Sequence, residues 1–95
     1  MENKIIEFIE KNKLNLNDSG SGLNSTCTIL AGYCLYLGVE DVDDLLVKLA
    51  DWLDEKEIDE DIFDKEFKRV FNYAKEHDYG KFWTSEEAKN MYVIL

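Results

Sequence analysis

Few side chains in this sequence are of the types that serve as nucleophiles, general bases or metal ligands. The chain has two cysteines, Cys27 and Cys34, and a single histidine, His77. His77 has no cysteine or aspartate at ligand spacing, and two cysteines seven residues apart complete no standard zinc pattern. Thr84 and Ser85 precede a predicted helix, where hydroxyl groups are better explained as caps than as nucleophiles. The sequence therefore predicts no catalytic residue, no metal and no cofactor.

The two cysteines are expected to be reduced. If they lie on one helix, seven residues separate their backbones by about 10 Å along its axis. Disulfides need backbones within roughly 7 Å. The N-terminus has charges every few residues and no uninterrupted apolar run, so it matches neither a signal peptide nor a membrane span. These features predict buried thiols in a cytoplasmic protein that does not engage membranes.

The C-terminal third mixes cations with aromatic rings. Single-stranded nucleic acid needs this combination, because cations bind phosphates and rings stack on bases for about 1 to 3 kcal/mol each. In a competing interpretation, Phe82 and Trp83 simply close the core, and the basic residues complement helix dipoles. The candidate residues for contact with nucleic acid or a nucleotide are Lys68, Arg69, Lys75, Lys81, Phe82 and Trp83.

Acidic residues are concentrated in one segment. The chain has 21 acidic and 11 basic residues, a net charge of -10. Thirteen of the acids lie between Glu40 and Glu66 with only three lysines, so this segment alone is net -10 and the remainder is neutral. Such a balance excludes a basic, autonomous nucleic-acid-binding module. The segment is either a surface for a basic partner, to which carboxylates resemble phosphates, or a solvated outer face.

Apolar residues recur at helical spacing through most of the chain, and no segment alternates as a strand does. The spacing predicts helices within residues 1–17 and over residues 25–37, 42–53 and 61–76, and a last helix after Ser85 on which Ala88, Met91 and Tyr92 face inward. Residues 25–37 are apolar on nearly every face, which is typical of a central helix. Gly32 in its middle predicts a close helix crossing. The fold class is all-α, a compact orthogonal bundle of about five helices.

Residues 18–24 have the composition of a linker. Residues 1–95 therefore form one domain, in which a Gly/Ser link over 18–24 joins an N-terminal helix within 1–17 to a helical body over 25–95. Residues 81–83 are expected to be extended. The apolar end of the chain must dock on the body or serve a partner. The candidate residues for partner binding are Trp52, Trp83, Tyr92, Val93, Ile94 and Leu95.

Four short patterns carry a resemblance to a known family. They are Gly20-x-Gly22-Leu23-Asn24-Ser25, Leu30-Ala31-Gly32-Tyr33, Leu37-Gly38-Val39 and Glu66-Phe67-x-x-Val70-Phe71-x-x-Ala74. In this order the chain resembles the primase C-terminal helical domain of mobile-element replication proteins, which commonly has arginine where this chain has Leu23. In size and charge it is also similar to the small middle-protein subunits of primase-polymerase modules on staphylococcal cassette chromosomes. The resemblance implies an accessory subunit whose A-family DNA polymerase partner supplies the metal-dependent chemistry.

The expected function combines the residue patterns with what the resemblance implies. We expect a subunit without catalytic activity of its own that binds the DNA polymerase of a mobile-element replication module and supports de novo primer synthesis. Within that complex it would contact single-stranded template or an initiating nucleotide. The alternative is an acidic inhibitor, a DNA mimic or antitoxin-like protein, whose segment from Glu40 to Glu66 occupies the nucleic-acid site of a basic enzyme.

Overall fold

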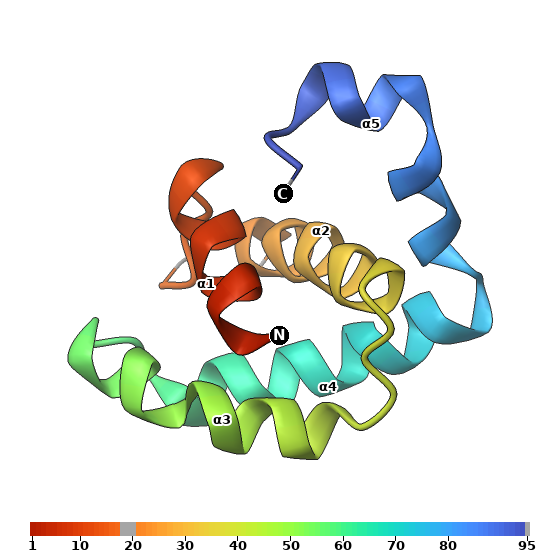
Figure 1. Ribbon diagram of the computed structural model, residues 1–95. Helices are drawn as coiled ribbons and strands as arrows, with labels where there is room; N and C mark the ends of the chain where they lie inside the picture. The colour runs from red at the N-terminus through yellow and green to blue at the C-terminus, as the bar shows by residue number, and fades with distance from the viewer. Residues whose placement is uncertain (18–20, 95) are drawn as a thin grey trace.

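The chain is arranged around one helix, α2 (Ser21–Tyr36), which crosses the centre of the computed structural model (Figure 1). The structure describes residues 1–17 and 21–94. Around α2 lie α1 (Glu2–Lys11), α3 (Val42–Glu55) and α4 (Glu60–Glu76), followed by a 3-10 helix, η1 (Tyr79–Thr84), and α5 (Glu86–Met91). Every regular element in these described residues is a helix, which confirms the all-α prediction. Five residues of α2 are wholly buried: Cys27, Leu30, Ala31, Tyr33 and Cys34.

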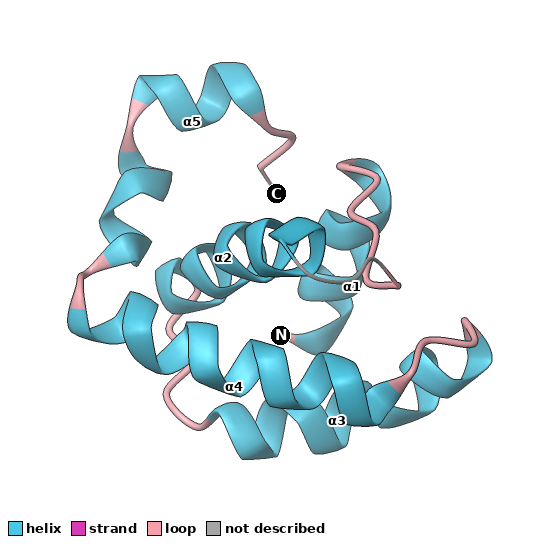
Figure 2. Cartoon of the chain, turned by 180° about the vertical axis from the view of Figure 1, so that it is seen from behind, coloured by secondary structure: helices cyan, strands magenta, loops and turns pink. Residues whose placement is uncertain are grey.

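Helix α4 packs along α2, and α3 lies beside α4 (Figures 1 and 2). Helices α3 and α4 each begin at an aspartate whose carboxylate accepts a hydrogen bond from the third residue beyond it. Asp41 accepts from the Asp44 amide at 3.1 Å and Asp59 from the Ile62 amide at 3.2 Å. These caps satisfy amides that have no partner inside the helix. Both helices match the predicted ranges to within two residues, because the apolar stripe and the capping aspartate of each helix indicate the same boundaries.

Helix α2 begins at Ser21, four residues before its predicted start. Residues 22–24, expected in a flexible link, are therefore helical, while residues 18–20 of that predicted link lie outside the described residues. Leu23 explains the difference, since it is buried and stands one helical turn before the buried Cys27. The burial of Leu23 outweighs the low helix propensity of the neighbouring Gly22.

Helix α1 packs on the body. It occupies only part of the range 1–17 within which a helix is predicted. Lys13, two residues after its end, lies in the left-handed region at a φ of 54°. Ile5, Phe8 and Ile9 are buried, and Leu16 in the following loop also reaches the core. This apolar face anchors the first element against α2 and α3.

Four aromatic residues join segments that are distant in sequence. The rings of Phe8 and Tyr33 stack with centroids 3.8 Å apart. Trp83 meets both edge-on, at 5.3 Å and 5.6 Å, and Tyr92 lies 4.9 Å from Trp83. These four residues, the aromatic cluster, connect α1, α2, η1 and the segment after α5.

The segment predicted to be extended, residues 81–83, lies in η1 instead. This element rests against α2 at two glycines. A Cβ atom added to Gly32 would lie 2.7 Å from Trp83 Nε1, and one added to Gly80 would lie 3.1 Å from Leu35 Cβ. The close contact predicted at Gly32 is confirmed, but its partner is the 3-10 helix. Only glycine leaves room for so tight an approach.

Helix α5 begins where the sequence predicts. The Ser85 hydroxyl oxygen accepts a hydrogen bond from the Ala88 amide at 3.2 Å, so Ser85 is the cap. Ala88 is buried and Tyr92 is half-buried, as expected. Met91 is 59% exposed, so its predicted inward orientation is wrong. The helix ends at Met91, and Ala88 within it and Tyr92 just after it pack inward.

Candidate functional site

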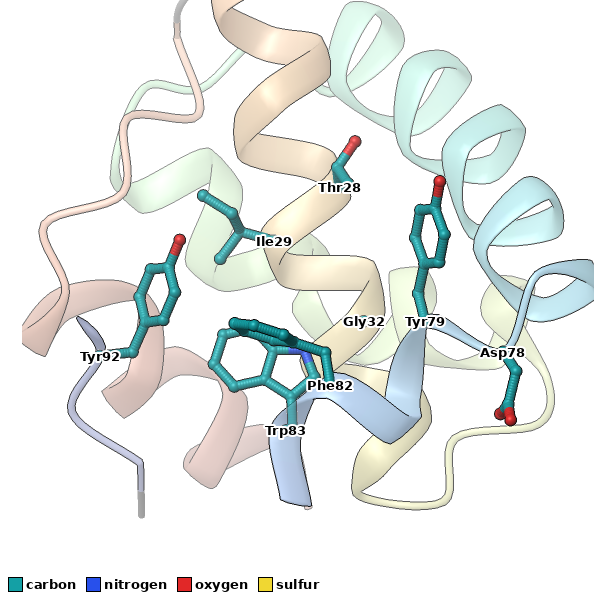
Figure 3. A pocket seen from close by; sticks show the side chains of 8 residues that line it. All are labelled: Thr28, Ile29, Gly32, Asp78, Tyr79, Phe82, Trp83 and Tyr92. Atoms are coloured by element: carbon teal, nitrogen blue, oxygen red, sulfur yellow. The ribbon is translucent and has the colours of Figure 1, made fainter. Parts of the chain in front are cut away.

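A pocket of about 340 Å³ opens between α2 and η1 (Figure 3). We call it the aromatic pocket. Gly32 and Ile29 line it from α2, and the rings of Phe82 and Trp83 line it from η1. Its lining is completed by Thr28, Asp78, Tyr79 and Tyr92. Ligand sites are typically apolar concavities of this size with a few polar groups at their margins.

One end of the aromatic pocket carries hydroxyl groups. The side chains of Thr28 and Tyr79 both point toward α4 there, and Asp78 lies beside Tyr79 with its carboxylate directed away from the other labelled side chains (Figure 3). The Thr28 hydroxyl donates to the Asn24 carbonyl at 2.9 Å. Partial desolvation, and then the neighbouring Tyr73, raise the pKa of Tyr79 above its ordinary value. Both hydroxyl groups at this end are therefore polar and uncharged.

Two further hollows continue from that end. The first, about 250 Å³, shares Thr28 and Tyr79 with the aromatic pocket and adds Arg69 and Tyr73 from α4. The second, about 320 Å³, shares Arg69 and adds Lys65. The three hollows follow one another through these shared residues, first between α2 and η1 and then between α2 and α4, and together we call them the α2 groove. Aromatic rings line one end of it, and the cations of α4 line the other.

Glu66 holds Arg69 in place within the α2 groove. Arg69 Nε donates to Glu66 Oε1 at 3.1 Å, and its terminal nitrogen Nη2 donates to Oε2 at 2.8 Å. The Asn24 side-chain amide also donates to Glu66 Oε2 at 3.1 Å. The hydrogen bonds from Arg69, and then that from Asn24, hold the pKa of Glu66 below its ordinary value. The guanidinium is thus oriented by a fixed carboxylate but largely exposed to solvent.

Exposed rings gather beside this groove. Tyr73, which is 51% exposed, stacks on His77 with centroids 3.9 Å apart and meets Tyr79 edge-on at 5.8 Å. His77 Nδ1 lies 2.9 Å from the Tyr73 carbonyl oxygen, so the ring is fixed in this stack. Tyr73 and Thr28 were not among the predicted contact residues. The positions of Asn24, Thr28 and Gly32, spaced by four, could have indicated this face of α2.

Trp83 is the most buried of the predicted nucleic-acid contacts. Its side chain is only 3% exposed and is surrounded by four aromatic rings, those of Phe8, Tyr33, Phe82 and Tyr92. This burial agrees with the competing interpretation, in which Trp83 closes the core, while its contact with nucleic acid or a partner stays a prediction. The physical reason for the burial is that Gly32 lets the indole approach α2 closely enough to join the core. Phe82 beside it remains 37% exposed.

The predicted cations fall into two groups. Lys68 pairs with Asp43 of α3 at 2.8 Å, an interaction that raises the pKa of the lysine, and Arg69 pairs with Glu66 as described. Lys75, in the last turn of α4, and Lys81 of η1 are exposed. Only Arg69 of these four lines the α2 groove. The structure thus brings Arg69 and Phe82 to one groove and places Lys68 on the face shared with α3.

The predicted partner-binding residues separate as well. Trp52 is half-buried and lines a different hollow of about 340 Å³ between the end of α3 and the segment after α1. Tyr92 and Ile94 pack against the core, and Val93 is 47% exposed. The Asn12 side chain donates to the Val93 carbonyl at 2.9 Å and accepts from its amide at 2.8 Å. Leu95 lies outside the described residues.

The acidic segment covers α3 and the start of α4. Asp51, Asp54 and Glu55 are exposed on one face of α3, at positions i, i+3 and i+4. Asp41 and Asp59 in the same segment are helix caps, so part of this charge has a structural role. Asp64 is half-buried, and desolvation raises the pKa of its carboxyl despite the opposing effect of Lys68.

The cysteines lie in the core, as predicted. Both are free and buried. Burial raises the pKa of the Cys27 thiol to about 12, with a smaller contribution from Glu66, and burial raises the pKa of Cys34 still further. Both therefore remain protonated at neutral pH and are poor nucleophiles.

Residues 1–17 and 21–94 contain neither a cluster of metal ligands nor a membrane-spanning helix. No group of three or more histidine, cysteine, aspartate or glutamate side chains is placed to hold a metal ion. No helix there is both long and apolar enough to cross a membrane. Comparison of the chain with protein-family models, curated proteins and solved structures finds no match.

Proposed function

We propose that the protein is a non-catalytic accessory subunit of a DNA polymerase in a mobile-element replication module, and that it supports de novo primer synthesis. The observation that carries the proposal is the α2 groove, where exposed rings and an oriented guanidinium lie along one concave surface. Single-stranded nucleic acid is bound by this pairing of stacking surfaces with cations. The resemblance to primase helical domains supplies the replication context.

The proposed role is to position reactants. Starting a primer requires two nucleotides to meet on a template before any duplex holds them, and this costs association entropy. A groove that stacks bases and binds a phosphate lowers that cost without performing chemistry. The net charge of -10 opposes binding to free DNA, since phosphates are repelled by exposed carboxylates. Binding inside a complex avoids this problem, because a basic polymerase compensates the charge.

The test is a priming assay with an A-family DNA polymerase of such a replication module. The two proteins are co-purified and supplied with unprimed single-stranded template. We expect a stable complex and primer synthesis that depends on the small subunit. Extension of a pre-annealed primer should be unaffected. Absence of a complex together with unchanged initiation would overturn the proposal.

Charge reversal sharpens the test. Lys75→Glu combined with Lys81→Glu should abolish the support of priming, because both cations are exposed at the end of the chain that carries the rings. Lys4→Glu with Lys11→Glu on α1 is a matched control with the same change in net charge. Equal loss in both double variants would indicate a general charge effect and contradict a role for the C-terminal cations.

The inhibitor alternative is retained because Asp51, Asp54 and Glu55 form an exposed acidic face on α3. It predicts that polymerase activity falls when the protein is added. It also predicts that D51N/D54N/E55Q relieves this inhibition, whereas K75E/K81E does not. The accessory proposal predicts the opposite pattern. Asp59 is left unchanged in both tests because it caps α4.

A further inference from the structure

We infer that the aromatic pocket binds an uncharged flat ring, a nucleobase, with the attached sugar and phosphate directed along the α2 groove toward Arg69. This inference rests on the proposed function for the choice of a nucleotide over other planar ligands. It adds a base site distinct from the exposed cations Lys75 and Lys81, and it fixes the direction in which the nucleotide lies.

The shape of the pocket favours a planar ligand. Gly32 lines the pocket on α2 and contributes no side chain to it. Phe82, Tyr79 and Tyr92 present partly exposed rings around the pocket, and Trp83 forms the wall behind them. A flat ring placed there contacts aromatic groups on several sides. Stacking of this kind tolerates any base, because every base has a π-face.

Charge determines which part of a nucleotide enters. No cation lines the pocket among the described residues, and its one charged residue is Asp78, so a phosphate would have no charge partner there. A neutral base needs none. On the side that faces α4, the hydroxyl groups of Thr28 and Tyr79 lead to the hollow that holds Arg69 (Figure 3). The sugar and phosphate are therefore favoured on the Arg69 side.

Arg69 is suited to receive that phosphate. Glu66 engages Nε and Nη2 of Arg69, which fixes the plane of the guanidinium. Lys65 lines the adjoining hollow and adds a second cation. Because Arg69 lines both hollows, a strand continuing from the base site would follow the same cations. Planar guanidinium groups bind phosphate with defined geometry.

Trp83 provides a direct readout. The chain has two tryptophans, and the other, Trp52, lies in a different hollow. In a Trp52→Phe chain, emission comes from the pocket wall alone. We expect adenosine to quench this emission saturably and adenosine monophosphate to bind about fivefold more tightly, the gain from one exposed charge pair of about 1 kcal/mol. Ribose 5-phosphate should cause no saturable quenching. Calorimetry on the unsubstituted chain provides a second measurement.

Three variants test the orientation. Arg69→Gln should remove the advantage of the monophosphate while leaving adenosine affinity unchanged. Phe82→Leu should lower the affinity for both ligands about tenfold, because one stacking surface is lost. Lys4→Gln on α1 removes an equal charge outside the groove and should change neither affinity. Loss of affinity for both ligands in Arg69→Gln would overturn the assigned direction.

The inference and the proposed function fail in different ways. If adenosine neither quenches Trp83 nor gives heat of binding at millimolar concentration, the base site is wrong, whatever the priming assay shows. If ribose 5-phosphate binds as well as the monophosphate does, recognition of the ring is likewise contradicted. If adenosine binds as described but the polymerase neither binds the protein nor changes initiation, the accessory role fails and the base site stands.

Discussion

At the scale of single residues, Gly32 has the largest structural effect for its size. Its missing side chain lets Trp83 Nε1 approach α2, which converts a potential surface ring into part of the core. Gly32 also lines the aromatic pocket, together with Trp83. One glycine therefore determines both how η1 packs and where the wall of the pocket lies.

Gly32→Ala should destabilise the protein. The new Cβ would lie 2.7 Å from Nε1 of Trp83. Because the Trp83 ring packs against four other aromatic rings, a shift of the indole would cost packing energy. Overpacking costs about 1 to 3 kcal/mol, and alanine regains about 1 kcal/mol of helix propensity. A net loss of about 1 kcal/mol is expected in urea unfolding. In a Trp83→Phe background the substitution should cost less, and an unchanged cost would contradict the assigned clash.

Two carboxylates of α4 respond to pH in opposite ways. Glu66 has a lowered pKa because Arg69 and Asn24 donate to its ionised form, so its contribution to stability is present above pH 4.5 and is lost as pH falls through its lowered pKa. Asp64 has a raised pKa because it is partly desolvated. Its ionised form opposes folding, so its protonation stabilises the protein as pH falls through the raised value.

Glu66→Gln and Asp64→Asn should therefore change stability with opposite signs at pH 7. We expect a loss of up to about 1 kcal/mol for Glu66→Gln, since the pair is largely exposed. Asp64→Asn should raise the melting temperature by a few degrees, or about 0.5 kcal/mol. Thermal unfolding between pH 7 and pH 3 checks both. The Glu66→Gln deficit should shrink as pH falls through the lowered pKa of Glu66, and a deficit that stays constant down to pH 3 would assign the loss to packing.

At the scale of elements, one side chain hydrogen-bonds the segment after α1 to the segment after α5, beside the ring contacts of the aromatic cluster. Asn12, which follows α1, bonds both the amide and the carbonyl of Val93 and also donates to the Phe8 carbonyl at 3.0 Å. This arrangement holds the segment after α5 in place, so that Tyr92 covers Trp83. Helix α5 otherwise packs mainly on η1.

Asn12→Ala should release that segment without unfolding the body. The two lost bonds to Val93 are exposed and the third, to the Phe8 carbonyl, is part-buried, so the cost in global stability is about 1 kcal/mol. Amide exchange at Val93 and Ile94 should accelerate at least tenfold, while exchange in α2 and α4 changes far less. Asn15→Ala is a control in the same loop. Equal acceleration throughout the chain would show that Asn12 acts on global stability instead.

Elements with clear stripes and caps could be predicted from the sequence, and those defined by tertiary contact could not. Helices α3 and α4 carry both signals, at Asp41 and Asp59 and along their leucine and phenylalanine stripes. The start of α2 and the conformation of η1 depend on what Leu23 and Trp83 touch. The α2 groove was only half predicted, because Arg69 and Phe82 stand out in the sequence whereas Thr28 does not.

At the scale of the whole molecule, charge is distributed unevenly over the surface. The segment from Glu40 to Glu66 holds the entire net charge of -10. Ion pairs such as Lys48 with Asp44 and Lys68 with Asp43 offset a small part of it, and their side chains are about half exposed or more. Exposed pairs contribute little, so repulsion among the remaining carboxylates opposes folding.

Salt should therefore stabilise the protein. Raising NaCl from about 20 mM to about 500 mM shortens the Debye length from roughly 20 Å to roughly 4 Å. We expect the melting temperature to rise by about 4 to 8 °C, corresponding to about 1 kcal/mol. The D51N/D54N/E55Q variant should have a higher melting temperature at low salt, and this temperature should rise less as salt is added. KCl should act equally, since screening is non-specific, and a melting temperature that falls with salt would contradict net repulsion.

The aromatic cluster also determines when the chain can finish folding. Phe8 and Tyr33 are synthesised early, whereas Trp83 and Tyr92 come late, and the Asn12–Val93 bonds span 81 positions. On the ribosome, α2 can form as soon as it emerges, but the Phe8–Tyr33 stack lacks its edge-on partner until translation has passed Trp83. During that interval an apolar surface is open to chaperones or to other nascent chains. The speed of translation through the last helices therefore sets how long the protein is exposed to misassembly.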